Sequence, residues 1–340
     1  MKRTYFPPAL ALTLLFSTHS IAQSKSHDLK LEPKNIHWGY YDAKLTPVLR
    51  IASGDTVRVE TMVAGGLARL RLAGVKEDDI PASLKVIENA VTERGPGAHP
   101  MTGPIFVEGA TPGDSLEVHF VAYEFLHPYG VIAFTPGLGT LPDEFPYAGL
   151  KLIPVNEKAG TADFGNGITL KLAPFFGSIG VAPPPLMGRI SSRPPGPNVG
   201  NLDNKDLVAG ATLYMPVHVP GALLSIGDGH GLQGDGEVSG TALETSLRGT
   251  IQVILRKGKK ITWPRAETPT HYITMGLNED LDEAMKMALR EMIDFLVAEK
   301  GMNRDDAYLL CSVAVDFRVT QTVDATKGIH AMIAKSLLPR

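Results

Sequence analysis

The sequence predicts a β-rich α+β fold, a β-sandwich or distorted barrel made of two similar β-units, with peripheral helices towards the C-terminus. Three observations lead to this prediction. The 340 residues include 35 Gly and 26 Pro, which favours short strands joined by turns over a helical bundle. Short segments of alternating polarity recur between the turn residues. Strong helical periodicity is confined to residues 279–300.

Strands are predicted where apolar and polar residues alternate, or where a short apolar run lies between turn residues. Thr56–Glu60 is the clearest case, because its residues alternate as in a half-buried strand. The predicted strands are two within 47–63 around a Gly-Asp turn, then 105–108, 115–123, 131–134, 150–155, 168–172, 211–219, 222–226 and 242–256.

Three segments are predicted to be helical. Residues 78–91 begin with acidic residues and place Pro81 in the first turn, both of which are helix-start signals. Residues 279–300 carry an apolar stripe at helical spacing, and residues 305–315 follow as a second C-terminal helix.

A weak internal repeat supports the two β-units. Pro104–Ala110 aligns without gaps with Pro216–Ala222, and a Gly-Asp pair follows each copy. Gly-Asp turns recur by chance in β-rich chains, but a seven-residue match is harder to attribute to chance. We therefore expect one domain over residues 23–340, which could divide into sub-units 30–180 and 181–340.

The N-terminus has the pattern of a secretory signal peptide over residues 1–22. Lys2 and Arg3 precede a short apolar run at 9–16, and Ser20-Ile21-Ala22 has the small-x-small form of a cleavage site. We expect cleavage after Ala22 and an exported protein, either periplasmic or secreted. No segment approaches the roughly 20 apolar residues that span a bilayer, so no stable membrane anchor is expected.

The charge distribution argues against nucleic acid as a partner. The chain has 33 basic and 36 acidic residues, a net charge of −3, and no basic tract. Attraction between basic residues and phosphates dominates the binding of nucleic acid, and a chain without a basic tract lacks it.

The chemistry is concentrated in Ser225–Glu244, with the sequence SIGDGHGLQGDGEVSGTALE. Its glycines allow positive φ angles and close approach of the backbone to a ligand. Apolar segments on both sides predict that this stretch is a loop held between core strands.

Asp228 and His230 are two residues apart, so in an extended segment their side chains point to the same side. A carboxylate and an imidazole on one side suit zinc. Asp235 and Glu237 repeat the spacing and could bind a second ion or act as a general base. The alternative is a Gly-Asp-Gly turn with solvated carboxylates, but the density of polar groups favours a site.

Other parts of the chain must complete such a site. His99 lies in a Gly/Pro loop before a strand, a common position for a ligand. The remaining histidines that could contribute are His37, His218, His271 and His330. The chain has no Gly-x-Ser-x-Gly, P-loop or dinucleotide fingerprint, so metal-activated water is favoured over nucleophilic catalysis.

These residues resemble the acetamidase/formamidase family. Gly227-Asp228-Gly229-His230, followed by Gln233–Glu237 and then Glu244, is similar to the family's G-D-x-H-x-x-Q-G-D-G-E core and the acid after it. Three further segments match in order: His99 with 102–114, then 200–207 with Asn201 and Asp203, then 216–222.

The resemblance implies hydrolysis of a small amide to a carboxylate and ammonia. The functional candidates that it implies are His99, Glu108, Asn201, Asp203, Asp228, His230, Asp235, Glu237 and Glu244. We expect a divalent metal ion, with zinc preferred and calcium as the alternative, held by Asp228, His230, His99 and Glu244.

For catalysis we expect Glu237 or Glu244 as the general base, with Asp235 and Asn201 in support. The residues expected to contact the substrate are Asn201, Gln233, Glu108 and Asp203. Two alternatives stay open: a hydrolase of another C–N substrate such as a cyclic amide, and a non-catalytic binding protein that uses the ion structurally. A homodimer is compatible with the sequence.

Overall fold

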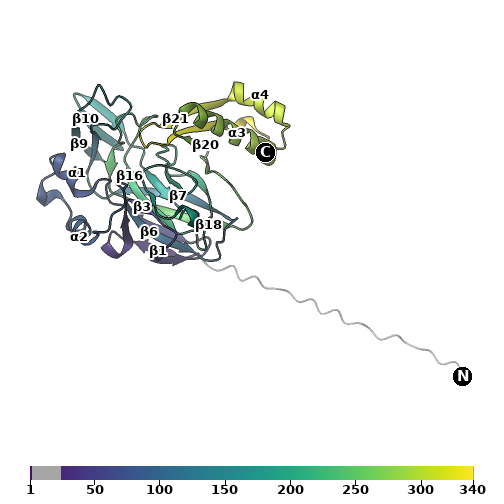
Figure 1. Ribbon diagram of the computed structural model, residues 1–340, viewed down its shortest axis with the longest axis horizontal. Helices are drawn as coiled ribbons and strands as arrows, with labels where there is room; N and C mark the ends of the chain where they lie inside the picture. The colour runs from purple at the N-terminus through teal and green to yellow at the C-terminus, as the bar shows by residue number, and fades with distance from the viewer. Residues whose placement is uncertain (2–23, 340) are drawn as a thin grey trace.

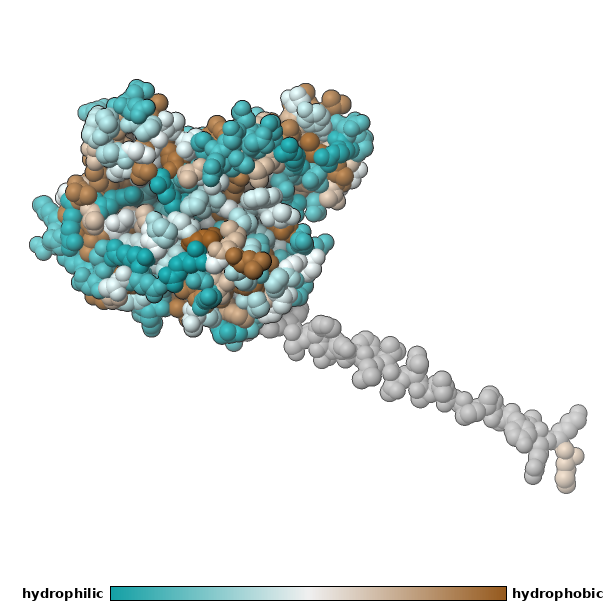
Figure 2. Space-filling model, in the orientation of Figure 1, coloured by the Kyte–Doolittle hydropathy of each residue, from teal (hydrophilic) through white to brown (hydrophobic). Residues whose placement is uncertain are grey.

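Two large β-sheets form the body of the molecule in this computed structural model, which describes Met1 and residues 24–339 (Figure 1). A third, two-stranded sheet joins β3 (Tyr40–Tyr41) to β13 (Ile190–Ser191). Polar residues cover much of the face in Figure 2, and apolar residues there form separate groups.

The nine-stranded sheet draws its strands from the whole chain. In spatial order they are β1 (Ser26–Leu29), β5 (Thr56–Glu60), β18 (Leu247–Arg256), β7 (Ser115–Phe125), β15 (Thr212–Pro216), β19 (Arg265–Glu267), β20 (His271–Asn278), β22 (Lys327–Ala334) and β21 (Val315–Gln321). Alternate residues of β18 are buried from Leu247 to Val253, so one face of this sheet meets the core.

The eleven-stranded sheet contains the glycine-rich stretch. Its main path is β11 (Ile168–Lys171), β10 (Thr161–Gly165), β9 (Gly149–Asn156), β8 (Tyr129–Phe134), β17 (Glu244–Thr245), β16 (Leu224–His230), β12 (Phe175–Gly180) and β14 (Val199–Asn201). Off this path, β6 (Pro100–Val107) pairs with β16, β2 (Ile36–Trp38) and β4 (Leu49–Ile51).

The main hydrophobic core lies between the two large sheets. Val57 and Val118 contribute from the first sheet, and Ile105 and Ile226 contribute from the second. Each of these side chains is fully buried, and burying such a side chain contributes about 1.5–3 kcal/mol to folding. Because both sheets draw strands from both halves of the chain, we propose that the described residues form one domain.

The sequence repeat marks two crossings between the sheets. The first copy links β6 in one sheet to β7 in the other, and the second copy links β15 to β16 in the opposite direction. The crossings lie side by side, because Val107 N donates to Gly221 O at 2.9 Å and Gly221 N donates to Ala110 O at 2.9 Å. The Gly-Asp pairs differ, however: Asp114 is in a turn before β7, whereas Asp228 lies inside β16.

The helices are peripheral, as expected. They are α1 (Gly66–Leu72), α2 (Ala82–Ala90), α3 (Leu281–Lys300) and α4 (Arg304–Ala314), with short 3₁₀ turns at Pro33–Asn35, Glu77–Asp79, Pro185–Met187 and Lys335–Leu337. Asp280 caps α3 by accepting from Glu283 N, and Gly301 ends it with a left-handed φ of 68°. In Figure 1, α3 and α4 lie together beside β20 and β21.

The predicted fold class is confirmed: the chain is β-rich, with multiple sheets, peripheral helices and, in residues 24–339, no closed barrel. The predicted helices correspond to α2, α3 and α4, while α1 was not predicted. The predicted signal peptide, residues 1–22, lies outside the described residues apart from Met1. Among the described helices, none combines the length and the apolar character needed to cross a membrane.

Candidate metal centre

Strand β16 carries the first two residues of the site. The expected loop is therefore a strand over its first part, because β16 runs from Leu224 to His230 and every residue in it is buried. Its glycines permit this packing: a Cβ on Gly227 would lie 2.7 Å from Met101 Sδ, and one on Gly229 would lie 2.8 Å from Thr245 O. The strand thus places Asp228 and His230 inside the protein.

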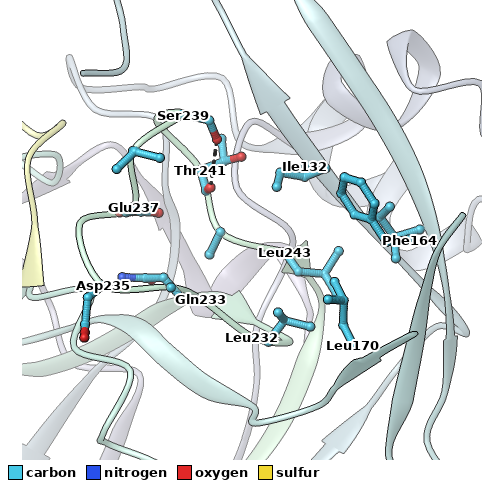
Figure 3. Close-up of a pocket in the computed structure, with 14 residues that line it drawn as sticks. Ile132, Phe164, Leu170, Leu232, Gln233, Asp235, Glu237, Ser239, Thr241 and Leu243 are labelled. Carbon is cyan, nitrogen blue, oxygen red and sulfur yellow. Dashed lines mark hydrogen bonds between the residues drawn. The ribbon is translucent and has the colours of Figure 1, made fainter. Parts of the chain in front are cut away.

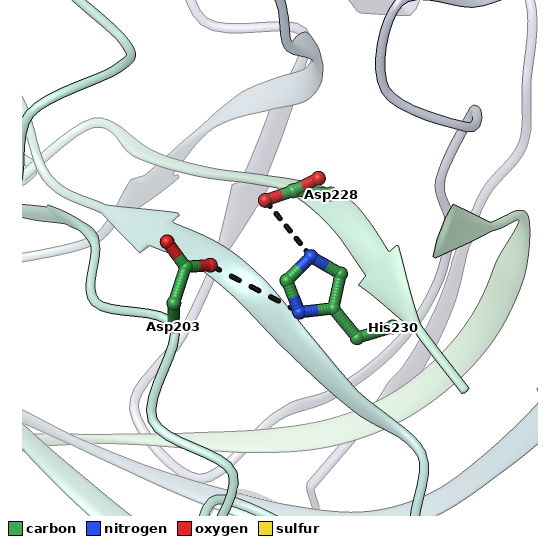
Figure 4. Close-up of side chains that lie close together, drawn as sticks. All are labelled: Asp203, Asp228 and His230. Atoms are coloured by element: carbon green, nitrogen blue, oxygen red, sulfur yellow. Dashed lines mark ion pairs between the residues drawn. The ribbon is translucent and has the colours of Figure 1, made fainter. Parts of the chain in front are cut away.

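Asp228, His230 and Asp203 converge, as Figure 4 shows. His230 Nε2 lies 3.3 Å from Asp228 Oδ2, and His230 Nδ1 lies 3.9 Å from Asp203 Oδ1. Asp203 comes from the segment after β14, and its carboxylate faces Nδ1 of the ring whereas that of Asp228 faces Nε2 (Figure 4). Each ring nitrogen therefore has a carboxylate near it.

Three further carboxylates complete the cluster. Glu244 lies opposite His230 in the β16–β17 pair, with its Oε1 3.6 Å from His230 Nε2. Glu237 follows Gly236 in the glycine-rich stretch, and Asp324 comes from the turn between β21 and β22. The ligand atoms fall into three groups, each within 4.8 Å: Asp203 with Asp228 and His230, His230 with Glu237 and Glu244, and Asp203 with Glu237 and Asp324.

The backbone at this cluster is strained. Asp203, Asp228 and Glu237 have φ angles of 48°, 56° and 45°. A left-handed conformation costs a non-glycine residue about 1–3 kcal/mol and persists where the surrounding structure enforces it, often at functional sites. Three strained carboxylate residues in one buried cluster therefore support a functional role.

Several ligand atoms have no hydrogen-bond partner among the described residues. They are Asp203 Oδ1, Asp228 Oδ1, His230 Nε2, Glu244 Oε2 and Asp324 Oδ2. Leaving a buried polar group unpaired costs roughly 1–3 kcal/mol, and more for a charged group. Oxygen and imidazole donors that lack protein partners and face one another fit a divalent cation.

Burial and mutual repulsion set the charges of the metal-free cluster. Burial and the Asp228 carboxylate raise the pKa of Glu244 to about 8. Burial also raises the pKa values of Asp203 and Glu237 well above their ordinary range, and neighbouring carboxylates raise them further. For His230 burial acts in the opposite direction, but the Asp228 and Glu244 carboxylates outweigh it and raise the pKa to about 10.

Hydrogen bonds behind the cluster orient the ligands. His230 Nδ1 lies 3.1 Å from Gln233 Oε1, and Gln233 Nε2 donates to Asp203 O at 2.7 Å. A donor on Nδ1 leaves Nε2 free to bind a cation, an arrangement common for metal-bound histidines. Asn201 Nδ2 similarly donates to Asp203 Oδ2 at 2.6 Å and, through Oδ1, accepts from Ser178.

His99 joins the cluster from the loop before β6. Its Nε2 lies 3.8 Å from Asp228 Oδ2, and its Nδ1 lies 3.2 Å from Ser192 O, which can only accept a hydrogen bond. His99 therefore also directs Nε2 towards the carboxylates.

A pocket of about 170 Å³ opens onto the cluster. Its polar wall includes His99, Asn201, Asp203, Asp228, Glu237, Glu244, Asp324 and two arginines, Arg69 and Arg193, while Ala64, Pro96, Ala98 and Leu138 form its apolar wall. Figure 3 shows a second, more apolar pocket, lined by Ile132, Phe164 and Leu243, on which the 233–241 segment also borders. Glu237 lines both pockets, so this segment separates them.

Two of the expected site residues lie elsewhere. Glu108 is half exposed and pairs with Arg50, with Nε 2.7 Å from Oε1, so the structure does not bring it to the pocket. Asp235 pairs with Lys205 at 3.0 Å and lines the second pocket. Gln233, expected to contact substrate, is engaged with His230 and Asp203.

Sequence reasoning missed Arg69, Arg193, Asp324 and Gly177. Asp324 and the arginines lie in segments without a local motif, far along the chain from Ser225–Glu244. Gly177 lies in β12, where a Cβ would come within 2.5 Å of Asp203 Oδ1. No spacing in a single sequence marks these residues, because only the tertiary fold brings them together.

Solved structures resemble the chain over nearly its full length. An acetamidase from Bacillus halodurans is 32% identical with a TM-score of 0.77, covering 91% of this chain and 98% of that chain. An acetamidase from Yersinia enterocolitica is 31% identical with a TM-score of 0.79, covering 94% of each chain. A formamidase from Methylophilus methylotrophus is 29% identical over 192 residues, 42% of this chain and 47% of that protein. The chain thus spans about half the length, or less, of the curated relatives it matches.

The expectation of an exported protein is wrong. The relatives that the chain matches are formamidases and acetamidases, which are typically cytosolic. A charged start followed by a short apolar run is a weak pattern that chains can carry for other reasons.

The family itself is shown by a match over both halves of the chain. The model of the Acetamidase/Formamidase family matches residues 24–193 and 189–339. Its named members are amidases, which act on carbon–nitrogen bonds other than peptide bonds. The chain belongs to the acetamidase/formamidase family.

Proposed function

We propose that this protein hydrolyses a small carboxamide to a carboxylate and ammonia with the help of a divalent cation bound at Asp203, Asp228 and His230. One observation carries the proposal: the buried ligand atoms of these residues converge, and among the described residues Asp203 Oδ1, Asp228 Oδ1 and His230 Nε2 have no hydrogen-bond partner. Membership of a family of amidases supplies the reaction class.

The donor set favours zinc for this position. It combines an imidazole nitrogen with carboxylate oxygens, and His99 directs a further ring nitrogen towards Asp228. When bound, such a cation polarises the amide carbonyl and lowers the pKa of water. Asp203, which sequence reasoning assigned to the substrate, is thus proposed as a ligand.

The neighbouring group of Asp203, Glu237 and Asp324 has only oxygen donors. Oxygen-only sets suit calcium, magnesium or manganese. With Asp228 and Glu244 the cluster holds five buried carboxylates, and the pocket supplies only Arg69 and Arg193 as permanent positive charges. With all five ionised, one divalent cation and the two arginines would leave a negative charge, so this group is proposed as a second cation position.

Glu244 is the proposed general base. Its Oε2 has no partner among the described residues, and its Oε1 lies 3.6 Å from His230 Nε2, so a free carboxylate oxygen is available beside the proposed cation position for proton transfer. Glu244 accepts a proton from the attacking water as the carbon–oxygen bond forms. It returns the proton to the amide nitrogen as the carbon–nitrogen bond breaks, so that water and the neutral amide give carboxylate and ammonium. Glu237 remains the alternative base.

The pocket limits the substrate to a short acyl group. A volume of about 170 Å³ must contain the reacting atoms as well as the acyl chain, so it leaves room only for a short chain against the apolar wall.

Replacing His230 tests the proposal, with His218→Ala as the control. His218 Nε2 lies 2.8 Å from Pro197 O, and the residue is not part of the pocket wall. We expect the unchanged protein and His218→Ala to bind a divalent cation and release ammonia from short amides. His230→Ala should lose bound cation and at least roughly 100-fold in activity. Full retention of both by His230→Ala would refute the proposal.

A further inference from the structure

Arg69 reaches the pocket from α1, outside both the glycine-rich stretch and the carboxylate cluster. The helix is pressed against the body of the protein by Leu67 and Leu70, which are 2% and 1% exposed. Gly65 N donates to Ala98 O at 3.2 Å, which ties the start of α1 to the segment that carries His99. The base of the Arg69 side chain is therefore firmly held relative to the site.

The side chain of Arg69 is directed back over the start of its helix. A Cβ on Gly65 would lie 3.0 Å from Arg69 Nε, so the glycine leaves room for the guanidinium to pass. The guanidinium then reaches the pocket wall that also contains Asp228 and Glu244.

At the pocket, Arg69 is incompletely used by the protein. Its Nη1 is 3.6 Å from Glu244 Oε1, too far for a hydrogen bond of normal length, and this buried atom has no hydrogen-bond partner among the described residues. Arg193, the other arginine of the pocket, differs: its Nη2 donates to Val323 O at 2.7 Å, so the backbone already holds it. Arg69 is therefore the pocket arginine that has, among the described residues, a buried nitrogen without a hydrogen-bond partner.

We propose that Arg69 binds the acyl oxygen of the substrate, donating from Nη1 to the amide carbonyl and to the carboxylate of the product. This inference rests on the proposed function. A guanidinium is always charged and binds oxygen anions through directed N–H groups. During hydrolysis the carbonyl oxygen gains negative charge, and a fixed donor at that oxygen stabilises the transition state more than the ground state. The acyl oxygen would then point towards α1 and the leaving nitrogen away from it.

Arg69→Ala and Arg69→Lys test the inference, with Arg71→Ala as the matched control on the same helix. Arg71 is half exposed and pairs with Glu77 at 2.5 Å, outside the pocket. Bound cation, thermal unfolding, acetate affinity by calorimetry and steady-state ammonia release are measured on each variant. Acetate serves as the probe because it carries the carboxylate of a short product.

We expect Arg69→Ala to keep its cation and its fold but to bind acetate roughly 10- to 100-fold more weakly. Its kcat/KM should fall by roughly 100-fold, mainly through kcat, and added guanidinium at non-denaturing concentration should restore part of the loss. The acetate affinity and kcat/KM of Arg69→Lys should lie between those of Arg69→Ala and the unchanged protein. Arg71→Ala should match the unchanged protein in all four measurements.

Three results would overturn the inference: Arg69→Ala that binds acetate as tightly as Arg71→Ala, an unchanged protein that does not bind acetate, or loss of the cation from Arg69→Ala. The last would mean that Arg69 maintains the cation site rather than binding the substrate. If the unchanged protein released no ammonia from any amide, the proposed function would fail, while weaker acetate binding by Arg69→Ala alone would still support Arg69 as a ligand for the oxygen anion.

Discussion

The backbone of Gly177 lies so close to the His230 ring that a Cβ on this glycine would be 2.6 Å from His230 Cε1. The same Cβ would be 2.5 Å from Asp203 Oδ1 and 2.7 Å from Asp228 Oδ2. Gly177 belongs to β12, and its carbonyl oxygen accepts a hydrogen bond from Asp203 N at 3.2 Å. The backbone of this glycine therefore packs directly against all three proposed ligands.

Gly177→Ala should displace the ligands, because the new methyl group would occupy the space of three ligand side chains. We expect loss of bound cation and a fall of about 1–3 kcal/mol in the free energy of unfolding, typical of an overpacked interior. Metal analysis and denaturant unfolding measure the two effects. Gly234→Ala is the control, because a Cβ there would meet nothing within 4 Å. A Gly177→Ala protein that binds its cation normally would contradict this account of the site.

Gln233 should act on the cation through His230. Its Oε1 lies 3.1 Å from His230 Nδ1, and its Nε2 donates to Asp203 O at 2.7 Å. Gln233→Leu should therefore lower the affinity for the cation by roughly 10- to 100-fold, the usual effect of removing a partner behind a metal ligand. Competition with a chelator of known affinity provides the measurement. Gln252→Leu, at a residue of β18 that bonds Gly54 O, should leave the affinity unchanged. Equal affinities for both variants would show that Gln233 does not orient the site.

The metal-free protein should become less stable as the pH rises from about 6.5 to 10. Glu244 has its pKa raised to about 8, so ionising it in the folded protein becomes a cost above its ordinary pKa near 4.5. His230 has its pKa raised to about 10, so its contribution is complete below about pH 6.5 and is lost as the pH rises to 10. Both shifts lower stability as the pH rises, Glu244 up to about pH 8 and His230 up to about pH 10.

Thermal unfolding of the chelator-treated protein between pH 6.5 and 10 tests this prediction, and Glu244→Gln should flatten the slope below pH 8. A bound cation holds the ligands deprotonated, so the loaded protein should depend less on pH in the same range. A metal-free protein whose Tm rises with pH would show that the cluster is not charged as described.

Glu244→Gln should separate proton transfer from cation binding. Glutamine has nearly the same shape but cannot accept the proton from water, so kcat should fall by roughly 100- to 10,000-fold while the cation remains bound. Glu108→Gln is the control, because Glu108 pairs with Arg50 at the surface. Ammonia release and metal content are measured on both variants. Loss of cation from Glu244→Gln would instead make Glu244 a ligand, and normal activity would move the base to Glu237.

Much of the fold could be predicted from the sequence because its strands have local signals. Thr56–Glu60 alternates and forms β5, and the apolar stripe of 279–300 becomes α3. Helix α1 was missed because the run Gly66–Leu72 is short, begins with glycine and has no side-chain cap, although its Leu, Ala and Arg residues favour a helix. It packs against Trp38 and α2. The order of the strands in the two sheets could not be predicted, because local sequence patterns do not say which strands pair.

The candidate site could be predicted only where its residues are close in sequence. Asp228, His230, Glu237 and Glu244 share one stretch, so their convergence was foreseeable. Asp324 reaches them across the β21–β22 turn, through contacts that depend on the whole sheet. The left-handed φ at Asp203 is a property of the folded backbone, and the unpaired Nη1 of Arg69, among the described residues, is a consequence of burial. Residue types alone reveal neither.

The most direct test of the account is ammonia release from a short amide by protein stripped of its cation and then titrated with zinc. The account predicts negligible release by the stripped protein, and activity that rises in proportion to bound zinc until the Asp203–Asp228–His230 site is filled. Full ammonia release by the stripped protein, with its metal content verified on the same sample, would contradict it.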